Sequence, residues 1–172
     1  MMRRLRIAAA LLVALPLLGA VDPVPADLAP ADEKPVQRKF FVETADDAAM
    51  LDTALAKAKA EGKLAVIVFG GDWCHDSRAL AQTLTSGTFA REFGPRFAVT
   101  FIDVGVPQAG QGRNIDLVKR FGIKKLDSTP ALFVISPKGK RLNSKKDALG
   151  WRNADSRGEA AILAWFRAFK AD

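Results

Sequence analysis

The chain has 172 residues, of which 49% are hydrophobic and 26% charged, a balance typical of one ordinary globular domain. Its 26 lysines and arginines outnumber 19 acidic residues; without the three arginines among the first twenty residues the basic count is 23, and the formal charge falls from +7 to +4. Because this excess is small and scattered, we expect no nucleic-acid partner.

The first twenty residues have the layout of a secretory signal peptide. Three arginines precede an apolar run from Ile7 to Leu18, and small residues follow at Gly19-Ala20 and again at Pro25-Ala26. We predict cleavage after residue 20, or as late as residue 26, and export of the remainder, to the periplasm if the source is bacterial. The run is short for a bilayer span, so no stable membrane insertion is expected after cleavage; a retained anchor is the alternative.

The predicted domain spans residues 38–172. Before it, residues 21–37 hold four prolines and little apolar periodicity, a composition that predicts a flexible tether.

The first half of the domain is predicted to alternate strands and helices. Thr44 offers an N-cap for a helix whose apolar residues repeat at helical spacing until Gly62. The continuous apolar run 64–69 is typical of a central strand buried on both faces. The predicted strands here are 38–42, 64–69 and 97–104, and the other predicted helices are 74–84 and a short piece at 89–93.

The second half begins with a loop at 104–113, after which Asn114 is expected to cap a short helix ending at Phe121-Gly122. A strand at 131–135, a turn at 136–139 and a return strand at 140–143 form a predicted hairpin. Ser156 and Glu159 make a capping box for a last helix. Its buried face is predicted to consist of Ile162, Leu163, Phe166 and Phe169. The basic run is read as a solvated hairpin: Lys138, Lys140, Arg141, Lys145 and Lys146.

This order of elements implies an α/β domain. A βαβ half followed by a ββα half predicts a mixed central sheet covered by helices on both faces.

Cys74 is the single cysteine of the chain. An odd cysteine in an exported protein indicates either intermolecular pairing or a free reactive thiol. Cys74 comes directly after a predicted buried strand and at the first turn of a predicted helix, where the helix dipole and the exposed amides favour the thiolate and lower the thiol pKa. The alternative is an inert, buried small side chain.

The neighbours of Cys74 act on its charge with opposite signs. Arg78, one turn further on, adds a positive charge on the same side, and His75 does so when it is protonated, whereas Asp72 and Asp76 oppose the thiolate. The sequence therefore predicts the direction of the shift and not its size.

Ser77 lies three residues after Cys74 and faces the same way. Its hydroxyl can donate a hydrogen bond to the thiolate, but it cannot attack a mixed disulfide as a second thiolate would.

The string VIVFGGDWCHDSR, from Val66 to Arg78, resembles the thioredoxin superfamily, in which a strand leads into a W-C-x-x-C helix start. Thr129-Pro130, before the strand ALFVI, looks like the cis-proline that faces the active-site cysteine in that family. The resemblance covers about residues 38–170. It implies a thioredoxin-like three-layer α/β/α sandwich, with Trp73, His75, Thr129 and Pro130 at the substrate site.

Two departures from the family pattern concern the resolving step. The second cysteine is replaced by Ser77, and the buried acid that many thioredoxins carry six residues before the nucleophile is replaced by Val68. We therefore expect ordinary dithiol reduction to be strongly impaired. The segments 104–113 and 124–128 look longer than in compact thioredoxins and are candidates to border the substrate groove.

Two functions remain open. In the first, Cys74 is a monothiol nucleophile that forms mixed disulfides with exported proteins or glutathione-type disulfides, and an external thiol or a second substrate cysteine releases it. In the second, the chain is a redox-inactive module that holds an extended peptide beside Thr129-Pro130. No cofactor is expected, and one histidine leaves too few ligands for a copper or zinc site.

Overall fold

The computed structural model describes residues 38–169. The predicted signal peptide (1–20), the predicted tether (21–37) and the last three residues of the predicted domain lie outside the described residues. None of the helices described between residues 38 and 169 has the length and apolar character needed to cross a membrane.

A three-stranded sheet forms the centre of the domain, with β1 (Leu64–Gly70) between β2 (Phe97–Asp103) and β5 (Ala131–Ile135). β1 runs parallel to β2 and antiparallel to β5, so that Phe69 pairs with Ile102 on one side and with Ala131 on the other. All seven residues of β1 are buried. The mixed central sheet predicted from the sequence is confirmed.

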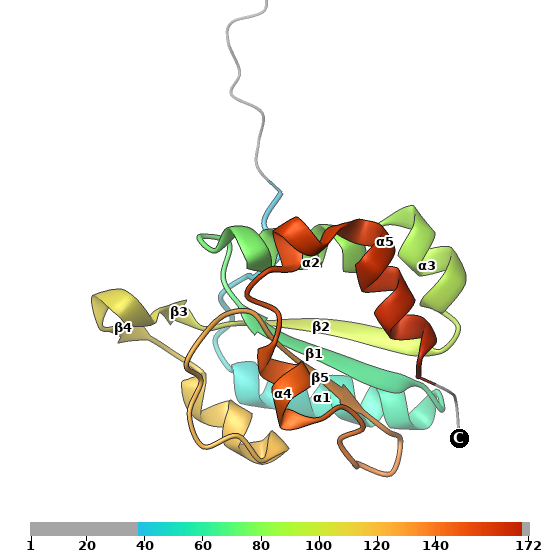
Figure 1. The fold of residues 1–172 in the computed structure, drawn as a ribbon. Helices are drawn as coiled ribbons and strands as arrows, with labels where there is room; N and C mark the ends of the chain where they lie inside the picture. The colour runs from blue at the N-terminus through green and yellow to red at the C-terminus, as the bar shows by residue number, and fades with distance from the viewer. Residues whose placement is uncertain (1–37, 170–172) are drawn as a thin grey trace, which may run out of the picture. The chain divides into compact units, whose positions relative to one another are not determined.

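Helices cover both faces of this sheet (Figure 1). One layer contains α2 (His75–Leu84), α3 (Gly87–Phe93) and α5 (Ala154–Arg167); the other contains α1 (Asp47–Ala60), α4 (Lys145–Leu149) and the 3-10 helix η2 (Ile115–Phe121).

Alternate side chains of β1 divide between the two layers. Val66 and Val68 pack in the core beneath α2 and α5, whereas Ile67 and Phe69 pack in the core on the α1 side. A fully buried side chain of this size contributes about 1.5–3 kcal/mol through the hydrophobic effect, so both cores stabilise the sheet. The predicted three-layer α/β/α sandwich is confirmed.

The predicted strand at 38–42 is wrong. The segment has no strand pairing; instead the Asp72 carboxylate accepts hydrogen bonds from the backbone N–H groups of Phe40 (3.1 and 3.2 Å) and Phe41 (3.2 Å). The Phe41 ring is buried and lies edge-on to Phe101, with 5.3 Å between centroids. The apolar residues that predicted a strand therefore belong to an irregular segment, and one side chain satisfies two of its amides.

The predicted return strand at 140–143 is reduced to one bridge between Ile135 and Arg141, made by two backbone hydrogen bonds: Leu142 N donates to Val134 O and Ser136 N donates to Lys140 O (2.8 Å each). Beyond it, the buried side chain of Asn143 takes the place of a strand. Its Oδ1 accepts from Val134 N (3.0 Å) and its Nδ2 donates to Leu132 O (2.8 Å).

The basic run predicted as a hairpin is also interrupted. Ser144 and Asp147 form a capping box that starts α4, so Lys145 and Lys146 lie on this short helix.

Two predicted helix starts are shifted. α1 is capped by Asp46, whose side chain accepts from Ala49 N (2.9 Å), while Thr44 Oγ1 donates to Asp47 Oδ1. α5 starts at Ala154, and the predicted Ser156–Glu159 capping box is wrong.

In α5, Gly158, with φ of 74°, breaks the helix, and the next residue, Glu159, accepts a hydrogen bond from Ser86 Oγ (3.3 Å). The predicted face of α5 is buried at Ile162, Leu163 and Phe166, and Phe169 is half-buried.

Candidate functional site

Cys74 lies where β1 leads into α2. Its backbone N–H donates to Gly71 O (3.0 Å) and its carbonyl accepts from Arg78 N (3.0 Å), so Cys74 is the N-cap residue of α2 and the helix begins at His75. The thiol is free and half-buried. The first amides of a helix lack intrahelical partners and favour an anion, so this position suits a thiolate.

Gly70 allows this close connection between the strand and the helix. A Cβ on Gly70 would lie 2.7 Å from Ser77 Oγ and 2.8 Å from the Phe41 ring. Any larger residue would push α2 away from the end of β1.

The structure brings Thr129-Pro130 against Cys74. The peptide bond between Thr129 and Pro130 is cis, and Cys74 Sγ lies within hydrogen-bonding distance of Thr129 O, at 3.7 Å. Pro130 is buried and Thr129 is half-buried. The contact arises because β5 starts beside the end of β1, where Ala131 pairs with Phe69.

Ser77 is fully buried on the inner face of α2. Its Oγ has no hydrogen-bond partner among residues 38–169. An unpaired buried hydroxyl costs about 1–3 kcal/mol, so a partner for this hydroxyl would stabilise the fold. The hydrogen bond from Ser77 to the Cys74 sulfur is not made in this structure, and its formation with the thiolate stays a prediction.

The three charged residues expected to tune the thiol each contact another part of the backbone. The Asp72 carboxylate binds the amides of Phe40 and Phe41, and Arg78 Nη1 donates to Asp72 O (2.6 Å). Asp76 is buried, and its Oδ1 accepts from Asp155 N (3.0 Å).

The remaining neighbour, His75, is exposed on 70% of its side chain, and its Nε2 lies 3.4 Å from Asp76 Oδ2. These residues therefore anchor the start of α2 to the segment before α1 and to α5, which the sequence pattern did not reveal.

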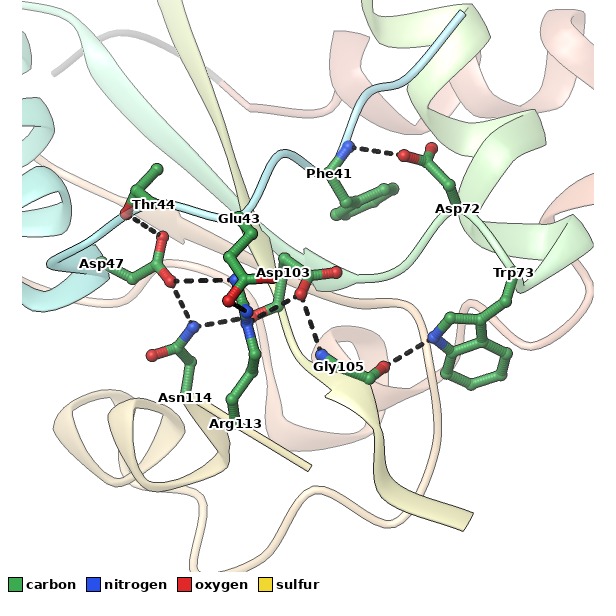
Figure 2. A network of polar contacts seen from close by, with 10 residues as sticks. All are labelled: Phe41, Glu43, Thr44, Asp47, Asp72, Trp73, Asp103, Gly105, Arg113 and Asn114. Carbon is green, nitrogen blue, oxygen red and sulfur yellow. Dashed lines mark hydrogen bonds and ion pairs between the residues drawn. The ribbon is translucent and has the colours of Figure 1, made fainter. Parts of the chain in front are cut away.

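Trp73 connects the thiol region to a small hairpin at 105–112, where the sequence predicts a loop. Its side chain is 41% exposed, and its Nε1 donates to Gly105 O at 2.6 Å (Figure 2). Gly105 starts the hairpin, which consists of β3 (Gly105–Val106), the 3-10 turn η1 (Pro107–Ala109) and β4 (Gln111–Gly112) and extends beyond the sheet (Figure 1).

Gly105 is required at this position. It has φ of 62°, and a Cβ would lie 2.2 Å from Gln111 O.

One guanidinium faces three carboxylates at the base of the hairpin (Figure 2). Arg113 Nε lies 2.9 Å from Asp103 Oδ2, although not in line for a hydrogen bond; Nη2 lies 4.0 Å from Asp47 Oδ2, and Nη1 contacts Glu43. Asn114 Nδ2 donates to Asp103 O (2.8 Å) and to the Asp47 carboxylate. We call Glu43, Asp47, Asp103 and Arg113 the Arg113 cluster.

The pKa of Asp103 in this cluster is raised above its ordinary value of 3.8. Desolvation is the largest cause, and the Asp47 and Glu43 carboxylates add to it, while the Gly105 N–H and Arg113 partly offset it. Sequence reasoning missed the cluster because its members lie up to 70 positions apart and form no motif.

A groove of about 200 Å³ lies between the hairpin and the loop before β5. Pro107 and Gln108 form one wall and residues 126–129 form the other. The groove therefore reaches Thr129, whose carbonyl contacts Cys74. Larger hollows lie elsewhere, for example about 280 Å³ between α2 and α5, and none of their lining residues belongs to the thiol contact.

Known proteins share this architecture. Residues 47–137 match the family model described as thioredoxin-like. The chain is similar to the crystal structure of a disulphide isomerase from Xylella fastidiosa Temecula1, at 30% identity and a TM-score of 0.66, over 76% of this chain and 95% of that one.

The chain is also similar to the C-terminal domain of DsbD from Neisseria meningitidis. The reduced form matches at 24% identity over 63% of this chain and 96% of that one, and the oxidised form at 22% over 68% and 99%, each with a TM-score of 0.41. The comparison with curated proteins found no match.

Proposed function

Because the chain belongs to the thioredoxin-like family, we propose that it carries out thiol–disulfide exchange with Cys74 as a single nucleophilic thiol. The observation that carries the proposal is the position of Cys74 Sγ, at the N-terminus of α2 and 3.7 Å from the carbonyl that precedes Pro130. The likeness to a protein described as a disulphide isomerase supports the same class of reaction.

In the first step, the Cys74 thiolate attacks one sulfur of a substrate disulfide. The bond between the two substrate sulfurs breaks, a new S–S bond joins the attacked sulfur to Cys74, and the departing thiolate takes a proton from water. No net oxidation or reduction has occurred, because one disulfide has replaced another.

The second step requires a thiol from outside the site, since Ser77 replaces the resolving cysteine and Val68 in the core offers no proton acceptor. A second cysteine of the substrate can attack the substrate sulfur, forming a new substrate disulfide and releasing Cys74, which is isomerisation. For a glutathione adduct, Cys74 takes the glutathione and frees the protein thiol; an external glutathione then forms glutathione disulfide and restores Cys74.

The substrates are proposed to be exported. The N-terminal twenty residues have the pattern of a signal peptide, and the reaction suits a compartment in which disulfides persist, the periplasm if the source is bacterial. The proposed partners are therefore protein or glutathione-type disulfides, with an external thiol as reductant.

The rate of Cys74 alkylation by iodoacetamide at neutral pH tests the proposal. Because the α2 amides favour the thiolate, we expect the folded protein to react faster than the same protein unfolded in urea, which is the control. A folded rate equal to the unfolded one, or a thiol that resists alkylation, would contradict the proposal.

The Ser77→Cys variant tests the second step. It should gain the ability to release its own mixed disulfide, seen as loss of a covalent complex on a non-reducing gel. Ser77→Ala is the matched control, because it removes the hydroxyl without supplying a thiol.

The groove beside Thr129 supports a second candidate, a module that binds an extended peptide without chemistry. Cys74→Ala separates the two functions: peptide affinity that survives in this variant, together with an unreactive thiol in the unsubstituted protein, would favour the module.

A further inference from the structure

We propose that Arg113 is a positioning residue that fixes the β3–β4 hairpin as one wall of the groove, and that this wall makes Cys74 react faster with disulfides on an extended polypeptide than with the same disulfide on a single amino acid. The inference rests on the proposed exchange function and adds to it a substrate class and a residue that enforces it.

The hairpin is held through both backbone groups of Gly105 (Figure 2). The Gly105 N–H donates to Asp103 Oδ2 (3.1 Å), and the Gly105 carbonyl accepts from Trp73 Nε1 (2.6 Å). One residue of the hairpin is thus joined on one side to the Arg113 cluster and on the other to the neighbour of the reactive thiol.

Arg113 holds the carboxylate side of this connection. Its N–H closes the base of the hairpin by donating to Val104 O (3.0 Å), and its guanidinium contacts Asp103, Asp47 and Glu43. Its side chain is only 24% exposed. Without this positive charge the three carboxylates would repel one another, and Asp103 would be driven away from the Gly105 N–H.

The hairpin matters because it contributes a wall of the groove that reaches Thr129, the residue whose carbonyl contacts the thiol. Pro107 and Gln108 face residues 126–129 across this groove. In an extended chain, consecutive residues are about 3.3–3.6 Å apart. A substrate whose cysteine meets Cys74 beside Thr129 can therefore extend its neighbouring residues into this groove.

The walls present both apolar and polar groups to the substrate. Pro107 and Leu126 are half-buried and apolar and can pack against an apolar side chain, whereas Gln108, Asp127, Ser128 and Thr129 offer polar groups to the peptide backbone. A lone capped cysteine has no such side chain and leaves the groove unused.

Two mixed disulfides with the same leaving group test the inference. One joins thionitrobenzoate to N-acetylcysteine amide, and the other joins it to the cysteine of a nine-residue peptide with leucine on both sides of that cysteine. Attack by Cys74 on the cysteine sulfur releases coloured thionitrobenzoate, the better leaving group, and leaves the cysteine bonded to Cys74. The ratio of the two second-order rate constants isolates the contribution of the peptide.

In the full-length mature protein we expect the peptide to react about tenfold faster, as positioning in a pocket provides. Arg113→Met should bring this ratio to about twofold or less while the small probe keeps its rate within about twofold. Arg113→Lys keeps the positive charge but loses the planar guanidinium, which can bond two carboxylates at once. Its peptide-to-small-probe rate ratio should therefore lie between those of the unsubstituted protein and Arg113→Met.

Lys119→Met is the matched control, because it removes a cation from an exposed ion pair with Asp116 (2.5 Å; Lys119 side chain 61% exposed) in η2. Its ratio should equal that of the unsubstituted protein. If Arg113→Met does not fold, Asp103→Ala tests the same connection, since it removes the carboxylate that accepts the hydrogen bond from Gly105 N–H and leaves the thiol's neighbours unchanged.

The outcomes separate this inference from the proposed function. If neither probe reacts with the unsubstituted protein, thiol exchange itself is wrong. If both probes react at equal rates, or if Arg113→Met slows both by the same factor, exchange stands and the positioning role is overturned. A peptide preference that survives in both Arg113→Met and Asp103→Ala overturns it as well.

Discussion

At the scale of single residues, Asp103 has two opposing roles. Its carboxylate holds the first amide of the hairpin, yet burial and two neighbouring carboxylates raise its pKa. The carboxylate positions the hairpin, and its ionisation lowers the stability of the folded state. Groups with shifted pKa values of this kind are often found near functional sites.

The effect of Asp103 ionisation on stability can be measured as a function of pH. A carboxyl with a raised pKa binds its proton more tightly in the folded chain, so the folded state loses stability as the pH rises from the ordinary value of 3.8 through the raised one. Asp103→Asn lacks this contribution. We expect the free energy of unfolding of the unsubstituted protein, minus that of Asp103→Asn, to decrease over this interval in urea titrations and to stay level at higher pH. A difference that increases with pH would contradict the assignment.

The residues of the thiol contact were predictable to different degrees. Cys74, Trp73 and Thr129-Pro130 stand out because a local motif marks each of them. The roles of Asp72 and Asp76 were not predictable, because their partners, Phe40, Phe41 and Asp155, are set by tertiary packing. From the sequence, a carboxylate near a thiol is expected to act through its charge. In the fold, these carboxylates instead accept hydrogen bonds from the amides of distant residues.

At the scale of elements, long periodic segments were predictable and short ones were not. β1 and α2 follow from continuous or periodic apolar residues. The strands β3 and β4 contain two residues each, too few for any pattern, and they depend on Trp73 and on the Arg113 cluster. The false strand at 140–143 has a related cause, since a side-chain amide replaces its backbone.

Asn143→Ala tests this replacement. It would leave the buried Val134 N–H and the Leu132 carbonyl without partners. An unsatisfied buried polar group costs about 1–3 kcal/mol, so the free energy of unfolding should fall by about 2–5 kcal/mol in urea denaturation. Asn153→Ala, which truncates an exposed asparagine, is the matched control. If the free energy of unfolding falls by no more than in this exposed alanine substitution, water satisfies both the Val134 N–H and the Leu132 carbonyl.

At the scale of the whole molecule, the sheet separates two cores. Ile162 on α5 is 1% exposed and belongs to the core beneath α2 and α5, while Ile102 on β2 is fully buried on the α1 side. The element order alone predicted this arrangement, because helices that alternate with strands must cover both faces.

Independent cores should give additive energies. We expect Ile162→Val and Ile102→Val each to lower the free energy of unfolding by about 0.5–1.5 kcal/mol. The double variant should equal the sum within about 0.5 kcal/mol, since the sites share no partner. Urea midpoints at constant slope provide the measurement, and a coupling larger than this would mean that the sheet transmits strain between its faces.

The contact between Asp72 and the amides of Phe40 and Phe41 has a practical consequence for handling the protein. It fixes the point at which the chain enters the domain within two residues of the thiol, whereas Phe169 O accepts a hydrogen bond from Arg96, beside the opposite end of the sheet. An affinity tag or a surface linkage attached just before residue 38 would crowd the reactive face. Attachment through the carboxyl end leaves that face open, and it is the orientation to choose for pull-down or biosensor work.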